Sequence, residues 1–223
     1  MIFSAKQNFN YYLRLLGEIF YPRRCQVCGQ TIDDGCFCAS CRRGFQLQKV
    51  IKNDDVLAEI FLLYKYERQL QQILHRIKFE RQRDFLPCLK EEACLSLPER
   101  LNVFTSSYDI IAGIPTSAER RQRRGFDVPE AIFSSLDRKR WRPNLLQRIR
   151  PTLPLYELEP ELRRQELQGC FKVLHQVSGK KILLCDDIFT TGSTMREAAA
   201  ALYSAGAAKV SALAFAASRD NWQ

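Results

Sequence analysis

The chain has 223 residues, of which 46% are hydrophobic and 26% are charged, a composition typical of a globular protein and not of a disordered one. No run approaches the roughly 18 consecutive apolar residues that a membrane-spanning helix needs, so we expect no transmembrane segment. Its 34 Lys and Arg outnumber its 25 Asp and Glu, and the net charge of +9 favours polyanionic partners.

The first predicted element is an amphipathic helix over residues 1–20, in which apolar residues recur three and four positions apart. Arg14 and Glu18 interrupt any apolar core of a signal peptide, and no small-residue cleavage site follows. We therefore expect a packed helix and a cytoplasmic protein. In that compartment the nine cysteines should be mostly reduced or metal-bound rather than paired.

Five cysteines crowd into residues 25–41 and include two C-x-x-C pairs. Each pair wraps a tight turn that presents two thiolates to one ion, and two such turns complete a tetrahedral Zn²⁺ site. The expected ligands are Cys25, Cys28, Cys38 and Cys41. Cys36 could compete with Cys38, and a loop of reduced thiols is the alternative. No open coordination position is apparent nearby, so we expect a structural ion.

Residues 1–48 are thus predicted to form an N-terminal helix and a zinc-binding module, and residues 49–223 a second domain. In that domain strands alternate with helices, which is typical of a parallel α/β sheet. The expected strands are residues 60–66, 108–114, 181–185 and 210–216. The expected helices are one with Leu70, Ile73, Leu74 and Ile77 on its apolar face, one from residue 116 towards 137, either continuous or interrupted, and one over residues 194–204.

The most informative segment follows the third of these strands. Asp186 and Asp187 come at its carboxyl end, where open α/β sheets bind ligands. Small and hydroxyl-bearing residues then open a helix, where backbone amides can close around a phosphate. These residues are Thr190, Thr191, Gly192, Ser193 and Thr194. Paired acids beside an anion cradle fit a sugar phosphate, although a plain helix-capping turn is the alternative.

This segment resembles the phosphoribosyl pyrophosphate (PRPP) site of type I phosphoribosyltransferases, and the chain as a whole resembles the ComF family (the ComFC/GntX-like group). The resemblance rests on Pro22-Arg23-Arg24-Cys25, the four-cysteine knuckle, Tyr66 with His75-Arg76-Ile77-Lys78-Phe79, Ile114-Pro115, Arg124-Gly125-Phe126 and Gln168-Gly169-Cys170-Phe171. It implies a type I phosphoribosyltransferase-like parallel sheet behind the zinc-binding module. It also implies a role in handling incoming single-stranded DNA during natural competence. Family members usually have Asn-Gln where this chain has Asp127-Val128.

The resemblance also implies roles for individual residues. The paired acids and the hydroxyl-rich loop bind PRPP, which carries Mg²⁺, and Pro115 and Thr116 belong to the same site. Asp186, Asp187 and Arg124 are the expected catalytic residues. Two functions stay open: an accessory protein of DNA uptake that binds PRPP or a related sugar phosphate, and an active phosphoribosyltransferase with an unknown acceptor.

A basic segment supplies the candidate DNA-binding residues. Residues 113–150 hold ten Lys and Arg against four acids, together with Phe126, Phe133 and Trp141, and cations interleaved with aromatics suit single-stranded DNA. The expected contacts are Arg120, Arg121, Arg123 and Arg124. A solvated helix face and buried core aromatics are the alternatives. The resemblance further suggests a competence helicase or a membrane DNA channel as a partner, with peripheral attachment at the inner membrane as an option.

Overall fold

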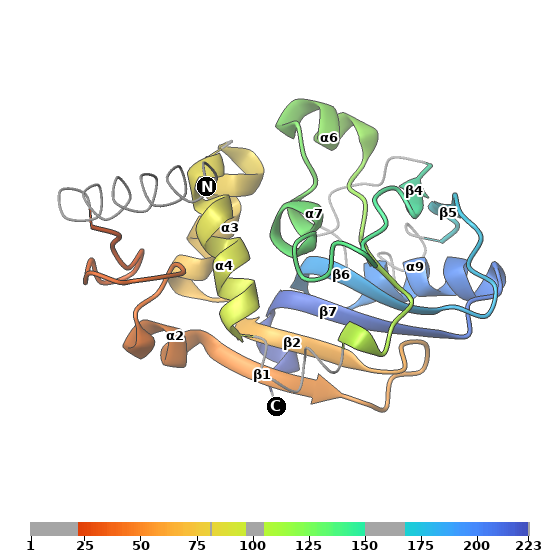
Figure 1. The fold of residues 1–223 in the computed structure, drawn as a ribbon, viewed down its shortest axis with the longest axis horizontal. Helices are drawn as coiled ribbons and strands as arrows, with labels where there is room; N and C mark the ends of the chain where they lie inside the picture. Colours follow the sequence, from red (N-terminus) through yellow and green to blue (C-terminus); the bar gives the residue numbers. More distant parts are fainter. Residues whose placement is uncertain (1–21, 81, 97–104, 150–167, 223) are drawn as a thin grey trace, which may run out of the picture.

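The computed structural model describes residues 22–80, 82–96, 105–149 and 168–222. The helix expected over residues 1–20 lies outside them. A five-stranded sheet with the order β1-β2-β7-β6-β3 forms the centre (Figure 1). Its strands are β1 (Gln46–Ile51), β2 (Ile60–Lys65), β3 (Ile110–Gly113), β6 (Lys181–Phe189) and β7 (Lys209–Ala217). β1 is antiparallel to β2, and all the other neighbours are parallel.

Helices cover both faces of this sheet. They are α2 (Ala39–Phe45), α3 (Arg68–Phe79), α4 (Leu86–Ser96), α6 (Ala118–Arg124), α7 (Val128–Phe133) and α9 (Ser193–Ser204). Apolar residues of α3, α4 and α7 share one core, and those of α9 share another with the two-stranded sheet of β4 (Leu146–Arg148) and β5 (Phe171–Val173). α6 contributes no fully buried residue and lies at the top of the view in Figure 1.

The strand sequences follow from this two-sided burial. Leu183 and Cys185 of β6 belong to the core with α3, whereas Ile182 and Leu184 belong to the core with α9. A strand buried on both faces is apolar at every position rather than at alternate ones. The predicted α/β fold with a mostly parallel sheet is therefore confirmed.

Several predicted elements have the expected bounds and others differ. The apolar face of α3 is buried as expected. The helix expected from residue 116 breaks at Gly125, whose φ of +87° ends α6 in the left-handed region that favours glycine. The strand expected over residues 181–185 continues to Phe189 because it stays paired with β7. β1, α4, β4 and β5 were not predicted, and β1 runs across the expected boundary between residues 48 and 49.

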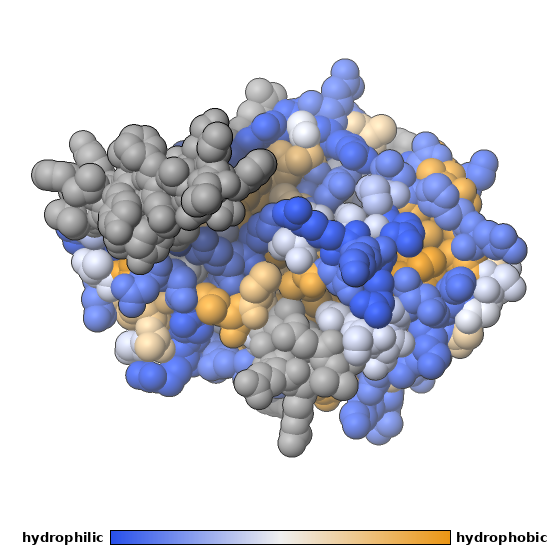
Figure 2. All heavy atoms as spheres, in the orientation of Figure 1, coloured by the Kyte–Doolittle hydropathy of each residue, from blue (hydrophilic) through white to orange (hydrophobic). Residues whose placement is uncertain are grey.

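In the orientation of Figure 2, hydrophilic side chains cover most of the surface around α6, and apolar residues show in separate patches. Among the described residues, none of the helices combines the length and the apolar character needed to cross a bilayer.

Candidate sugar-phosphate and nucleic-acid site

Asp186 and Asp187 lie near the carboxyl end of β6, and the strand extends past them to Phe189. Consecutive residues of a strand point to opposite faces, so the two side chains leave β6 on opposite sides. Asp187 is buried and accepts a hydrogen bond from Nζ of Lys78, in α3, at 2.9 Å. Asp186 Oδ1 accepts the backbone N–H of Asp187 at 2.8 Å.

The Asp186 carboxyl group titrates far from the ordinary range of an aspartate. Burial is the main cause that raises the pKa of Asp186 to about 8, the nearby charge of Asp187 acts in the same direction, and Lys78 opposes both effects. At neutral pH the Asp186 carboxyl group therefore holds a proton in most molecules and can donate a hydrogen bond as well as accept one. A donor and acceptor set of this kind suits a ligand rich in hydroxyl groups, such as a pentose.

Two side chains fix the orientation of the loop between β6 and α9. Asn221 Nδ2 donates to the carbonyl oxygen of Thr190 at 2.6 Å, and Arg196 Nη1 donates to that of Thr191. The C=O and N–H of a trans peptide point in opposite directions, so the amides of Thr191 and Gly192 point away from these two side chains. Two amides of the predicted anion cradle are therefore held in a fixed orientation, free of these two side chains.

Gly192 is needed where it stands for two reasons. Its φ of +76° lies in the left-handed region, and an added Cβ would lie 2.5 Å from Phe189 Cζ and 2.8 Å from Arg196 Nη1. The helix α9 begins at the next residue, Ser193, whose buried hydroxyl lies 2.8 Å from Thr191 Oγ1. The predicted loop residues are thus assembled at the N-terminus of a twelve-residue helix.

An ion pair between Arg196 and Asp54 holds this loop in place. Arg196 donates to both carboxylate oxygens of Asp54: Nε lies 3.3 Å from Oδ1 and 2.9 Å from Oδ2, and Nη2 lies 2.6 Å from Oδ2. Burial raises the pKa of Asp54, but Arg196 and the amides of Leu57 and Val56 together hold it below its ordinary value. The carboxylate therefore stays charged and fixes the guanidinium that binds the Thr191 carbonyl.

Pro115 and Thr116 lie at the same edge of the sheet as the paired acids. β3 runs parallel to β6 with Gly113 opposite Cys185, and the amide of Ile114 donates to the Cys185 carbonyl at 2.8 Å. Thr116 N donates to Oδ1 of the buried Asp127 at 3.0 Å, and burial raises the pKa of that carboxyl group. Asp127, where the family usually has Asn, thus fixes the turn after β3.

Three of the four predicted DNA-binding arginines lie together. Arg120, Arg123 and Arg124 of α6 line an open hollow of about 590 Å³ with Lys78 and Phe79 from the end of α3. We call these five residues the cationic hollow. Arg124 Nε donates to the Lys78 carbonyl at 3.1 Å, which ties the two helices together. Burial lowers the pKa of Arg124, but an arginine so placed remains charged at neutral pH.

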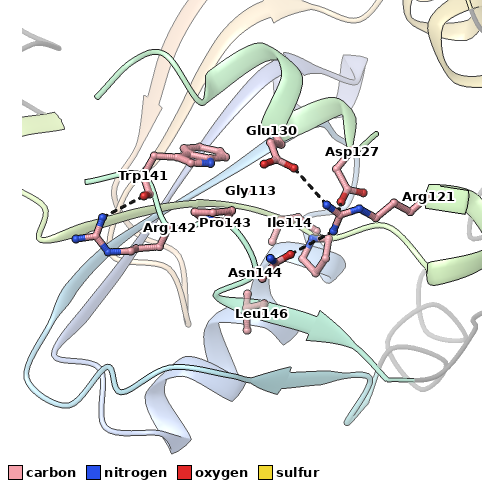
Figure 3. Close-up of a pocket in the computed structure, with 11 residues that line it drawn as sticks. Gly113, Ile114, Arg121, Asp127, Glu130, Trp141, Arg142, Pro143, Asn144 and Leu146 are labelled. Carbon is pink, nitrogen blue, oxygen red and sulfur yellow. Dashed lines mark hydrogen bonds and ion pairs between the residues drawn. The ribbon is translucent and has the colours of Figure 1, made fainter. Parts of the chain in front are cut away.

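Arg121 faces another pocket, shown in Figure 3. Its guanidinium lies between Asp127, at 3.4 Å, and Glu130, at 3.7 Å, and donates to Asn144 Oδ1 at 3.2 Å. The structure therefore separates Arg121 from the other three arginines, and its charge is balanced by two carboxylates.

The aromatic residues of the basic segment are not available for stacking. Phe133 and Trp141 are buried in the core with α3, which bears out the alternative that such residues are core residues. Phe126 is half-buried, and the Arg83 guanidinium lies 5.0 Å from its ring centre.

The four predicted zinc ligands converge. The sulfur atoms of Cys25, Cys28, Cys38 and Cys41 all lie within 4.8 Å of one another. The Cys28 and Cys38 sulfurs are 3.7 Å apart, and tetrahedral Zn²⁺ with Zn–S bonds of about 2.3 Å requires about 3.8 Å. The donor set therefore fits one zinc-sized ion. Burial raises the pKa of Cys25, but the amides of Cys28, Cys38 and Val27 lower it to about 6, which favours the thiolate that a metal binds.

Cys36 is not a competing ligand, because it forms a disulfide with Cys88 of α4. The cysteines were expected to be mostly reduced or metal-bound, and this pair is an exception, whose partners lie 52 positions apart and meet only in the folded chain. Beside the disulfide, the fully buried Glu92 accepts hydrogen bonds from Cys36 N at 3.2 Å and from Arg42 Nε at 2.5 Å. These contacts dock the cysteine-rich segment on α4.

Comparison with known proteins identifies the family. The model of the phosphoribosyl transferase domain matches residues 100–223, more than half of the chain. The chain belongs to this family. The ComF resemblance is confirmed by similarity to the Competence protein ComFC of Bacillus subtilis (strain 168), 25% identical over 185 residues that cover 82% of this chain and 73% of that protein.

Other relatives of this phosphoribosyltransferase-family chain are named DNA utilization protein YhgH. That of Escherichia coli (strain K12) is 26% identical over 196 residues, covering 83% of this chain and 86% of the relative. That of Escherichia coli O6:H1 is 31% identical over 149 residues, covering 65% of this chain and 66% of the relative, just under two thirds of its length. The paired acids, the loop and α6 all lie inside the family match, and the cysteine cluster lies before it.

Three residues of this phosphoribosyltransferase-like domain have a place at the site that sequence reasoning did not give them. Lys78 and Phe79 follow the predicted apolar face of α3, but nothing local shows that they meet α6 and β6. Arg148 of β4 has buried Nε and Nη2 atoms with no hydrogen-bond partner among the described residues. Burial lowers its pKa, and the charges of Arg120 and Asp186 act on it. The only signal for Arg148 was its membership of the basic segment.

Proposed function

We propose that this protein binds a phosphorylated pentose of the PRPP type at the carboxyl edge of β6 and single-stranded DNA in the cationic hollow, as an accessory protein of DNA uptake. One observation carries the proposal. Lys78 lines the hollow and also donates to Asp187, 2.9 Å away, so the two sites share a residue.

The sugar-phosphate half rests on the chemistry of the loop. The amides of Thr191 and Gly192 and the N-terminus of α9 suit a phosphate, and Asp186 and Asp187 suit the ribose hydroxyls. Mg²⁺ bound with PRPP would add positive charge at the diphosphate. Pro115 and Thr116 complete the edge on the β3 side.

The DNA half rests on charge. Among the residues that the structure describes, four cations and no acid line the cationic hollow, and arginine suits phosphate through its forked geometry. Relatives that carry the names DNA utilization protein and Competence protein support DNA as the polyanion.

Salt-dependent binding tests this half with a matched control. In the double variant Arg120→Ala/Arg123→Ala, affinity for a single-stranded oligonucleotide should fall, and the slope of log K against log salt should become shallower by about 0.7 for each phosphate that the variant no longer neutralises. The control Lys180→Ala/Lys181→Ala removes the same charge at the amino end of β6, where both lysines are exposed, and should bind nearly as the parent does. Equally weakened binding in the two variants would mean that net charge alone drives binding.

A second candidate is an active phosphoribosyltransferase. Arg148 lies near Asp186 and Arg124 near Asp187, so guanidinium groups flank both acids. In such a reaction the bond from C1 of the pentose to the diphosphate oxygen breaks, diphosphate leaves with the electron pair, and the acceptor forms a new bond at C1 and loses its proton. The cations would counter the charge that develops on the diphosphate. Diphosphate release from radiolabelled PRPP over a panel of base, amine and nucleic-acid acceptors tests it, and Asp186→Asn/Asp187→Asn should abolish any release.

The remaining parts of the proposal follow from the cysteine cluster and the family. Zn²⁺ fills the cluster as a structural ion, because four thiolates leave no open position for chemistry. The protein acts in the cytoplasm. Its partner is a competence helicase or a membrane DNA channel, and through this partner it attaches to the inner membrane. Co-purification of such a partner with the full-length chain tests this part.

A further inference from the structure

The last residue of α3 is an aromatic side chain that the core does not use. Phe79 is 62% exposed, more than any other large apolar side chain in the described part of the chain. It lines the cationic hollow beside Lys78, Arg120, Arg123 and Arg124. Burying a phenylalanine side chain completely is worth about 2 kcal/mol, and Phe79, which is mostly exposed, gains only part of that stabilisation.

A second ring extends this surface. His75 lies one helical turn before Phe79, and the two ring centres are 4.7 Å apart with an angle of 38° between the planes. The His75 side chain is itself 59% exposed, and its Nδ1 lies 3.7 Å from a carboxylate oxygen of Glu80. The i, i+4 spacing thus places two exposed rings on the same face of α3. We call Phe79 and His75 the aromatic pair.

The charges around the aromatic pair indicate what covers it. An apolar protein partner or a lipid tail would have to desolvate the surrounding cations, which is costly. A single-stranded nucleic acid offers both kinds of group that this surface needs: phosphates for the cations and flat bases for the rings. A duplex offers phosphates but keeps its bases stacked inside.

We propose that a nucleobase of single-stranded nucleic acid stacks on the aromatic pair while Arg120 and Arg123 hold the adjoining phosphates. This inference rests on the proposed DNA binding and assigns it a base-contacting surface. Two of the three aromatic residues of the basic segment, Phe133 and Trp141, cannot take this part because they are buried, and the third, Phe126, is half-buried with the Arg83 guanidinium over its ring. Stacking contacts the flat face of a base, which every base has, so this contact favours single strands without selecting their sequence.

The experiment compares two oligomers of equal length, oligo(dT) and an abasic strand with the same phosphates, by fluorescence anisotropy on the full-length, zinc-loaded chain. Phe79→Ala should bind oligo(dT) about ten-fold more weakly, within the range measured for base–aromatic stacking, and should bind the abasic strand as the parent does. Phe79→Tyr should restore oligo(dT) binding. The control Leu174→Ala removes another exposed apolar side chain, 43% exposed and following β5, and should change neither affinity.

A spectroscopic readout separates stacking from mere support of the hollow. In Phe79→Trp the added indole should lose fluorescence when oligo(dT) binds and keep it when the abasic strand binds. If Phe79→Ala binds oligo(dT) as the parent does, or weakens both oligomers equally, the stacking inference is wrong and the proposed DNA binding stands. If the parent chain binds neither oligomer, the proposed function fails, and this inference fails with it.

Discussion

Nζ of Lys78 lies 2.9 Å from Oδ1 of Asp187, although 109 positions separate the two residues in the chain. The ammonium group comes from the helix that borders the cationic hollow, and the carboxylate comes from the strand that ends at the loop before α9. A ligand at either site therefore meets one partner of the same ion pair. Binding at one site should change affinity at the other, and the change must be reciprocal.

Lys78→Met should lower the free energy of unfolding by about 2 kcal/mol, because it leaves the buried Asp187 carboxylate without its cation. The Asp187 side chain is 9% exposed and that of Lys78 21%, so solvent screens the pair only in part. Urea unfolding measures the destabilisation. Lys209→Met breaks a more exposed pair with Glu59, at 3.1 Å, and should cost about 0.5 kcal/mol. Equal destabilisation in the two variants would show that the Lys78 pair is an ordinary surface ion pair.

Gly192→Ala should weaken sugar-phosphate binding by more than backbone strain alone explains. Strain at a positive φ costs about 1–2 kcal/mol, and here the added Cβ also meets Phe189 and Arg196. Gly179→Ala is the matched control, because Gly179 has a similar φ of +68° and nothing within 4 Å of its added Cβ. Thermal unfolding and PRPP titration of both variants separate strain from collision. If Gly192→Ala and Gly179→Ala have the same unfolding midpoint and the same affinity for PRPP, the close contacts of Gly192 with Phe189 and Arg196 are contradicted.

Asp186 should give the protein a distinctive pH dependence of stability. Its pKa in the folded state, about 8, lies above the ordinary value of about 4, so the folded chain holds this proton more tightly than the unfolded chain does. The stability from this group is fully present below pH 4 and is lost as the pH rises through 8. Asp186→Asn cannot titrate at this position. The unfolding free energy of the parent minus that of Asp186→Asn should therefore fall between pH 5 and pH 9, and a constant difference would refute the raised pKa.

The cysteine cluster should hold about one Zn²⁺ per chain, measured by elemental analysis of the purified protein. Cys28→Ser should reduce the zinc content well below one and lower the unfolding midpoint, because the ion supplies folding energy to a segment that has little core of its own. Cys94→Ser, at an exposed free cysteine of α4, should leave both unchanged. Full zinc content in Cys28→Ser would exclude the predicted ligand set.

The spacing of residues along the chain predicted those parts of the fold that depend on neighbouring residues. The spacing of Leu70, Ile73, Leu74 and Ile77 gave the buried face of α3, and the C-x-x-C spacing gave the four converging thiols. β1 was missed because it is an edge strand with only partial burial, without the apolar run that marked β6.

The contacts that the sequence did not show are those between distant segments. Neither the disulfide from Cys36 to Cys88 nor the ion pair from Lys78 to Asp187 leaves a periodic signal, since each joins residues from separate elements. For the same reason four neighbouring arginines looked equivalent in the sequence, whereas the folded helix turns Arg121 towards Asp127 and Glu130 and the other three towards the cationic hollow.

Isothermal titration of the full-length, zinc-loaded chain with PRPP and Mg²⁺ is the decisive test of the sugar-phosphate site. We expect saturable heat from one site per chain. The heat should disappear in Asp187→Asn and persist in Asp33→Asn, which changes an exposed carboxylate in the cysteine-rich segment. An absence of heat with the parent chain, or an unchanged affinity in Asp187→Asn, would show that the paired acids and the loop do not bind a phosphorylated pentose.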